Sequence, residues 1–195
     1  MATRVLSVSS SSSHSFSKPS ALSINLIANH GIEGDCHAGK TVQHLSRLHI
    51  KPPPTNLRQV HLIPIEILHK VSSGLSASQQ ASLLKAGALG QNITTEGIDL
   101  LSLSTGTELH FVNAAAKDGD TTGPILVLTG LRNPCPQIDK FQSGLQERFV
   151  IRDANRQITG RLAGVMSIVK QGGVVKPGMR IDVVKPAKHI PLGVV

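Results

Sequence analysis

One stretch of the chain joins an apolar run to a proline-flanked cysteine: Ile125-Leu126-Val127-Leu128-Thr129-Gly130-Leu131-Arg132-Asn133-Pro134-Cys135-Pro136. Its first four residues are apolar, and such a run predicts a buried β-strand, Ile125–Leu128. Two prolines flank Cys135 and stiffen the loop that follows, and scaffolds often present reactive groups on such loops. Arg132 lies three residues before Cys135, and a nearby cation increases the thiolate fraction, the form that binds a soft metal. A buried, inert thiol is the alternative that the residues alone leave open.

Similar short runs, rich in β-branched residues and separated by Gly, Pro and Ser, recur outward from this stretch in both directions. They predict further strands over Arg4–Ser9, Leu22–Ile27, Arg58–Leu62, Glu108–Val112, Leu162–Val169 and Met179–Val184. Helices are predicted over Pro64–Val71, Ser78–Ala86 and, as a shorter piece, Ile138–Phe149. Many short strands with few helices favour a mainly β fold, a β-barrel or curled sheet with a few short helices.

The composition fits one soluble globular domain and limits its partners. Hydrophobic residues make up 39% and charged residues 16% of the 195 residues. Aromatic residues make up only 2%, so the stacking platforms that bind single-stranded nucleic acid are nearly absent, and no nucleic-acid partner is expected. No run approaches the roughly 20 apolar residues of a membrane span. We expect one domain over residues 4–184 and a C-terminal tail, Lys185–Val195, that trails off the core because it holds two Pro and a Gly.

The net charge of +8 is concentrated in residues 129–195, which hold 11 basic and 4 acidic residues. This excess indicates either an anionic partner (a phosphate ester, a nucleic acid or a membrane surface) or simply a solvated basic face. The two cysteines, Cys36 and Cys135, form no CxxC motif, which argues against a disulfide framework or structural zinc site and for a reducing compartment such as the cytoplasm. A Cys36–Cys135 disulfide stays open. So does a mitochondrial location, since the serine-rich start has Arg4 and no acidic residue.

A second motif, Gly31-Ile32-Glu33-Gly34-Asp35-Cys36-His37-Ala38-Gly39, has three glycines in nine residues. Such a backbone turns sharply or approaches a ligand closely. Asp35 can orient His37, which can then donate to an anion or act as a base. The alternative is a tight loop in which Asp35 caps its own turn and His37 is solvated.

A third group consists of Lys18, Arg58, Asn92 and Arg132, each of which lies at an end of an expected element near Gly or Pro. If a barrel gathers them, they form an anion pocket in which arginine grips a phosphate as a fork and lysine acts as a point charge. Taken singly, each cation is more often a solvated surface charge. The pocket therefore depends on a convergence in space that local sequence does not display.

The order of these motifs resembles the MOSC domain, which is related to the C-terminal part of molybdenum cofactor sulfurases. The motifs that carry the resemblance are Val8…Lys18, Gly31–Gly39, Arg58-Gln59-Val60, Gly87…Gly90-Gln91-Asn92-Ile93, Leu128–Cys135, Gly160-Arg161…Gly164-Val165 and Gly172-Gly173…Gly178. The likeness runs from about residue 4 to about residue 184, and it is strongest toward stand-alone bacterial proteins of the YiiM type.

The resemblance implies a β-barrel of the pyruvate-kinase barrel type that binds the molybdopterin form of the molybdenum cofactor. It implies that Cys135 is the molybdenum ligand or carries a persulfide. The residues at family-motif positions that would contact the cofactor are Lys18, His37, Arg58, Asn92, Thr129 and Arg132. Pyridoxal phosphate is linked to the separate N-terminal domain of full-length sulfurases, so we do not expect this chain to bind it.

Three functions follow from this resemblance. As an oxidoreductase of N-hydroxylated compounds, the chain would use Cys135 as metal ligand, take a small-molecule substrate and depend on a redox partner. His37, oriented by Asp35, would deliver a proton as the N–O bond breaks. As a sulfurtransferase, it would receive a Cys135 persulfide from a cysteine desulfurase, with Cys36 as a resolving thiol. The third function is a cofactor-binding module without turnover. A Cys135/His37 hydrolase is disfavoured because no oxyanion-hole signature is present.

Overall fold

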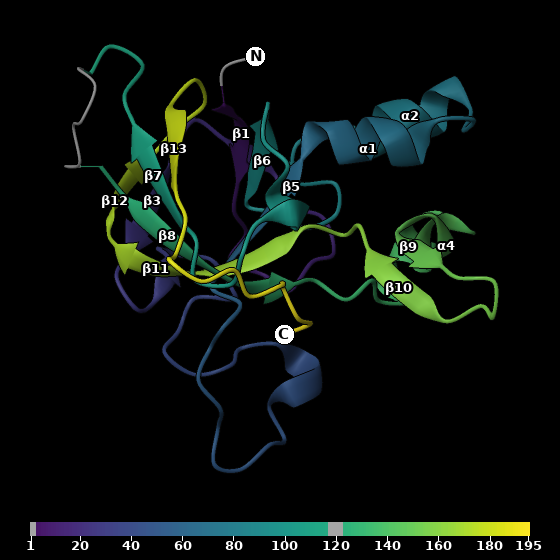
Figure 1. Ribbon diagram of the computed structural model, residues 1–195, viewed down its shortest axis with the longest axis horizontal. Coiled ribbons are helices and arrows are strands. Elements are labelled where there is room, and N and C mark those ends of the chain that lie inside the picture. Colours follow the sequence, from purple (N-terminus) through teal and green to yellow (C-terminus); the bar gives the residue numbers. More distant parts are fainter. Residues whose placement is uncertain (1–2, 117–122) are drawn as a thin grey trace.

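The computed structural model describes residues 3–116 and 123–195. Within these residues, seven strands close a β-barrel (Figure 1). In order of pairing they are β1 (Arg4–Ser9), β6 (Ile93–Glu96), β5 (Val60–Pro64), β11 (Val165–Gln171), β8 (Ile125–Leu131), β7 (Glu108–Val112) and β13 (Arg180–Val184). The barrel closes where Arg4 pairs with Arg180 and the Val5 N–H donates to the Met179 carbonyl at 2.9 Å. The predicted mainly β class with a few short helices is confirmed.

One pair of barrel strands, β5 and β6, is parallel, with Leu62 opposite Ile93. Parallel neighbours need a crossover connection, and this one contains α1 (Ile65–Ser72) and α2 (Ala77–Leu83). The two helices lie side by side outside the barrel (Figure 1). A capping box fixes the start of α2, because the Ser76 hydroxyl accepts from the Gln79 N–H while the Gln79 side chain accepts from the Ser76 N–H. The helix predicted over Pro64–Val71 is shifted by one residue at each end, whereas the one predicted over Ser78–Ala86 ends earlier, at Leu83.

Two apolar clusters hold the fold together, and strand alternation separates them. Leu62 belongs to the cluster that fills the barrel, whereas its neighbour Ile63 belongs to a second cluster outside it, and both are fully buried. The outer cluster packs Leu68 of α1 and Leu83 of α2 with Phe149. Because β5 is covered on both faces, all of its residues are buried, including the polar His61, and the strand shows no alternation between buried and exposed positions.

The remaining elements decorate the barrel, and several differ from the prediction. They are β2 (Ser20–Ala21), β3 (Ile24–Ile27), β4 (Gly31–Ile32), β9 (Val150–Arg152), β10 (Ile158–Arg161), β12 (Gly173–Val175), α3 (Gln137–Phe141), α4 (Leu145–Arg148), η1 (Leu45–Arg47) and η2 (Leu100–Ser102). The strand expected over Leu22–Ile27 begins only at Ile24, and Leu22 is 93% exposed. The helix expected over Ile138–Phe149 is two helices, because Gly144 takes a left-handed φ of 75° between them.

The C-terminal residues contradict the expectation that they trail off the core. The Leu131 N–H donates to the Gly193 carbonyl at 2.7 Å, and the Val195 N–H donates back to Leu131. Leu192 is buried in the barrel cluster. These contacts use backbone groups at the end of β8, and no local pattern in the tail announces them.

A long excursion connects β4 to β5, and it extends away from the barrel (blue in Figure 1). It contains η1 and is anchored near its base by the Asn56 side chain, which donates to the carbonyls of His37 and Gly39 at 2.9 and 3.0 Å. Among the helices of residues 3–116 and 123–195, none is long and apolar enough to cross a membrane.

Candidate functional site

A cavity of about 310 Å³ lies where the loop after β1, the excursion after β4, the loop after β8 and the last residues of the chain meet. Its charged and titratable lining consists of Lys18, Arg47, Arg58, Arg132, His14, His37, His44, His61 and Cys135. Among the described residues, no aspartate or glutamate lines it. Such a concentration of positive charge attracts anions and raises their local concentration.

Cys135 borders this cavity on the proline-flanked loop that follows β8. The loop is fixed at both ends, since the Arg132 N–H donates to the Gly164 carbonyl at 3.0 Å and the Ile138 N–H donates to the Cys135 carbonyl at 3.0 Å. The thiol is partly exposed and has no disulfide partner. The position of Cys135 on a rigid loop at the end of a strand agrees with the prediction, although β8 continues to Leu131.

The Arg132 guanidinium lies directly beside the thiol. Its Nη1 donates to the Leu89 carbonyl at 2.6 Å, which fixes the side chain against the wall of the cavity. Burial lowers the pKa of Arg132, and its interaction with Cys135 acts in the opposite direction. Arg132 therefore places a positive charge beside the sulfur.

A buried ion pair lies beneath the cavity. The Lys18 ammonium is 2.9 and 2.7 Å from the two carboxylate oxygens of Asp35, and the two side chains are 2% and 0% exposed. Asp35 also accepts hydrogen bonds from the Asn92 side chain and the His37 N–H, both at 3.0 Å. Its carboxylate is thus fully occupied by donors, and it does not line the cavity.

These contacts decide the charge of both partners. Burial alone would raise the pKa of Asp35, but hydrogen bonds from His37 and the charge of Lys18 outweigh it and hold that pKa well below its usual range. Burial lowers the pKa of Lys18, and Asp35 opposes this shift. Asp35 is therefore a permanent carboxylate that holds loops together. Because it compensates the charge of Lys18, Lys18 contributes little to the positive charge of the cavity.

Arg58 has a different environment, in which part of its side chain has no partner. Its Nε atom is buried and makes no hydrogen bond to any described residue. Burial, with repulsion from Arg47 and Arg132, lowers the pKa of Arg58 to about 10. Buried donors in folded proteins almost always have acceptors, so an unpaired guanidinium N–H at a cavity indicates a place for an anion.

Two further histidines of the cavity are held neutral. Burial, reinforced by the positive charge of Arg58, lowers the pKa of His44 to about 4. Burial lowers the pKa of His61 far below its usual value, and its Nε2 is 2.8 Å from the Ala163 carbonyl. The sequence did not single out either residue, because His61 lies within the apolar run of β5 and His44 lies in the excursion.

The structure brings together most of the residues that the motifs indicated. Those that line the one cavity are Lys18, His37, Arg58, Asn92, Arg132 and Cys135. Asp35 lies under it, as described above. Thr129 is not among the lining residues, and its hydroxyl donates to the Leu57 carbonyl at 2.6 Å. Cys36 is also outside the lining, with its Sγ 3.2 Å from the His37 Nδ1.

Comparison with known proteins agrees with this architecture. No curated protein matches the chain. The YuaD protein from Bacillus subtilis superposes with a TM-score of 0.69 at 21% identity, over 95% of this chain and 97% of that one. YiiM from Escherichia coli superposes with a TM-score of 0.60 at 17% identity, over 98% of this chain and 73% of that one. YiiM from Geobacillus stearothermophilus superposes with a TM-score of 0.62 at 13% identity, over 97% of this chain and 79% of that one. These identities show the fold alone.

The family is shown by a match that spans more than half of the chain. The MOSC domain family model matches residues 35–182, a range that begins at Asp35, includes Cys135 and ends inside β13. The resemblance carried by the motif order is thereby confirmed. This chain belongs to the MOSC domain family.

Proposed function

We propose that this chain binds a molybdenum cofactor in the cavity, with Cys135 as the protein ligand of the metal, and reduces N-hydroxylated compounds. The observation that carries the proposal is that Cys135, Arg58 and Arg132 line the same cavity. A thiolate is a ligand for soft metals, and guanidinium groups bind phosphate through paired N–H donors. Both ends of a cofactor that joins a metal to a phosphate therefore have partners in one cavity.

The residues present fit such a group. The buried Arg58 Nε has no acceptor within residues 3–116 and 123–195, and a phosphate oxygen would supply one. Arg47 adds a second cation on the same side, since its charge acts on Arg58. A cavity of about 310 Å³ is at the lower end of the range for small-molecule sites. We assign phosphate binding to Arg47 and Arg58, whereas Lys18 supports the loops through Asp35.

When bound, the cofactor would supply the two-electron redox chemistry, and the chain would supply orientation and protons. Reduction of a hydroxylamine consumes two electrons and two protons, breaks the N–O bond and releases an amine and water. His37 is suited to carry one proton, since its 28% exposed side chain borders the cavity and its Nδ1 lies 3.4 Å from Asp35. The Asp35 carboxylate would orient the ring. The electrons would come from a separate redox partner.

The test of this proposal is an activity measurement on protein expressed in a host that makes the cofactor. With a chemically reduced dye as electron donor, the wild type should reduce an N-hydroxylated base, and Cys135→Ser should not. His37→Gln should retain cofactor and lose about 100-fold in turnover, the usual size of a general-acid contribution. His69→Gln, at an exposed position on α1, is the matched control and should behave as wild type.

Other outcomes would overturn the proposal in distinguishable ways. Cofactor bound without turnover would indicate a binding module. Sulfur added to Cys135 after incubation with a cysteine desulfurase, in a chain that holds no molybdenum, would indicate sulfur transfer. Full turnover in Cys135→Ser would remove Cys135 from the reaction altogether.

A further inference from the structure

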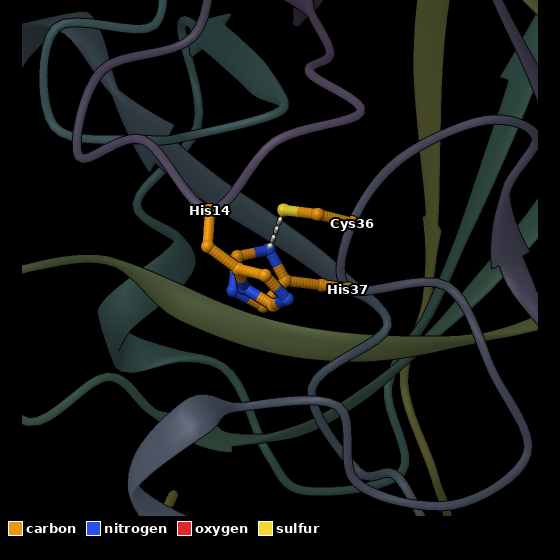
Figure 2. A group of neighbouring side chains, drawn as sticks. All are labelled: His14, Cys36 and His37. Atoms are coloured by element: carbon orange, nitrogen blue, oxygen red, sulfur yellow. Dashed lines mark hydrogen bonds between the residues drawn. The ribbon is translucent and has the colours of Figure 1, made fainter.

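Two histidines and a cysteine gather at the rim of the cavity, where the loop after β1 approaches the loop after β4. The side chains of His14, Cys36 and His37 point toward one another (Figure 2). The Cys36 Sγ is 3.2 Å from the His37 Nδ1, and one ligand atom from each of the three residues lies within 4.8 Å of the others. The rings of His14 and His37 meet edge to face, with centroids 5.3 Å apart.

These separations are close to those that a tetrahedral metal imposes. Bonds of about 2.3 Å to sulfur and about 2.0–2.1 Å to nitrogen place two ligand atoms about 3.5 Å apart. The 3.2 Å between Cys36 and His37 is near this value. The three ligand atoms lie within 4.8 Å of one another, so a ligand atom would have to move inward by about an ångström to bind the metal. His14 can make this movement because it is exposed.

The backbone holds the ligand-bearing loops together without a metal. The Cys36 N–H donates to the Ser11 carbonyl at 2.8 Å, which ties the loop that carries His14 to the loop that carries Cys36. The His37 N–H donates to Asp35 at 3.0 Å, as described for the ion pair. Two of the three ligands are therefore positioned in advance, which reduces the entropy cost of binding.

The charge around the cluster also restricts what it can bind. The cations of the cavity repel a metal ion, whereas the negative charge of Asp35 attracts it. The Asp35 carboxylate lies 3.4 Å from the His37 Nδ1 and 3.9 Å from the Cys36 Sγ. Asp35 cannot itself become a ligand, because Lys18 and Asn92 occupy its oxygens. On metal binding, a thiolate and two imidazoles would form the donor set, and this set selects borderline or soft cations over Mg²⁺ or Ca²⁺.

We infer that His14, Cys36 and His37 form a binding site for a d¹⁰ cation, Zn²⁺ or Cu⁺, at the rim of the cavity. Three protein ligands leave one tetrahedral position for water or another small ligand, as in zinc sites that act on substrates. Because His14 and His37 both line the cavity, this position is next to the space assigned to the cofactor. The site is separate from Cys135, and metal binding there does not require molybdenum. A metal bound to His37 would prevent His37 from carrying the proton in the proposed reduction, so these two roles of His37 are alternatives.

The test uses tag-free, metal-free protein and Co²⁺ as a spectroscopic substitute for Zn²⁺. Titration should give one equivalent of tetrahedral Co²⁺ with a thiolate-to-metal charge-transfer band, and Zn²⁺ should displace it. Cys36→Ser should abolish the band, and Cys135→Ser, the other free thiol, should retain it. Competition with a chromogenic Cu⁺ chelator under reducing conditions forms the second arm, and the tighter of the two metals identifies the cation.

Histidine variants test the remaining ligands. His14→Ala should weaken binding by more than the 10- to 100-fold typical of a lost outer partner, and its exposed position leaves folding intact. His37→Ala should do the same, and His69→Ala on α1 should have no effect. Absence of metal binding, a band that survives Cys36→Ser, or a band lost in Cys135→Ser would overturn the inference. None of these results bears on molybdenum content, which depends on Cys135.

Discussion

Lys18 and Asp35 form a doubly hydrogen-bonded ion pair, with the Lys18 Nζ 2.9 and 2.7 Å from the two carboxylate oxygens and both side chains buried. The pair joins the loop after β1 to the loop after β4, and Asn92 joins them at the start of β6 through its hydrogen bond to Asp35. Three segments that are far apart in sequence are therefore held at one point beneath the cavity.

Removal of one partner should destabilise the protein strongly. Asp35→Asn leaves a buried ammonium uncompensated, and we expect the free energy of unfolding to fall by about 3–5 kcal/mol, as for other buried pairs. Lys18→Met should have a similar cost, and the double variant should lose less than the sum because the two residues are coupled. Urea denaturation with a double-mutant cycle measures this, and strictly additive losses would contradict it.

The pH dependence of stability should contain a contribution from His44. Burial and Arg58 lower its pKa from 6.5 to about 4 in the folded chain, so the unfolded chain binds the proton more readily. The contribution of His44 to the free energy of unfolding is fully present above about pH 6.5 and is lost as the pH falls toward about 4. His44→Gln should flatten the unfolding free energy across this window relative to wild type, and a parallel curve would contradict the assignment.

Arg58 should be favourable for anion binding and unfavourable for stability. Since the guanidinium is partly buried beside Arg47 and Arg132, Arg58→Met should raise the free energy of unfolding by about 1 kcal/mol while it weakens binding of inorganic phosphate. Phosphate should raise the Tm of the wild type by mass action and have less effect on the variant. Arg58→Lys should not restore binding, because lysine lacks the planar fork.

The control for Arg58 is Lys85→Gln, which removes an exposed cation. It should change neither the Tm nor the phosphate response. An Arg58→Met variant that melts lower than wild type and keeps the full phosphate shift would contradict this description of the cavity.

Gly164 should be irreplaceable for reasons of both conformation and space. Its φ is +90°, and an added Cβ would lie 2.2 Å from the Leu62 carbonyl, while its own carbonyl accepts from the Arg132 N–H. Gly74 has a similar φ of +79° but open space around it. Gly74→Ala should cost only the strain of a left-handed alanine, about 1 kcal/mol. Gly164→Ala should cost considerably more and also weaken phosphate binding, and equal losses would contradict this account.

The parts of this architecture that could be predicted from sequence are those that depend on local pattern. The apolar run before Cys135 predicted β8, and the flanking prolines predicted a rigid loop there. By contrast, Ile93–Glu96 was not predicted as a strand, since it is short and follows a loop motif. It becomes β6 only because β1 and β5 pair with it from both sides.

The difference between local pattern and contacts made by the fold also explains which site residues were predicted from sequence and which were not. Lys18, Arg58 and Arg132 were named from their positions in motifs, but only closure of the barrel brings them to one cavity. Asp35 and Lys18 neutralise each other through contacts that span 17 residues, so local pattern did not separate a paired lysine from a free one. His14 lies in a serine-rich loop with no ligand spacing, and its place beside Cys36 is a property of the fold alone.

Molybdenum bound through Cys135 can be measured by elemental analysis of the chain after tag-free purification from a host that makes the cofactor. We expect molybdenum, with matching oxidised-pterin fluorescence, in the wild type and in Cys36→Ser, and loss of molybdenum in Cys135→Ser. A wild-type chain without molybdenum, or a Cys135→Ser variant that retains it in full, would contradict a molybdenum site at Cys135.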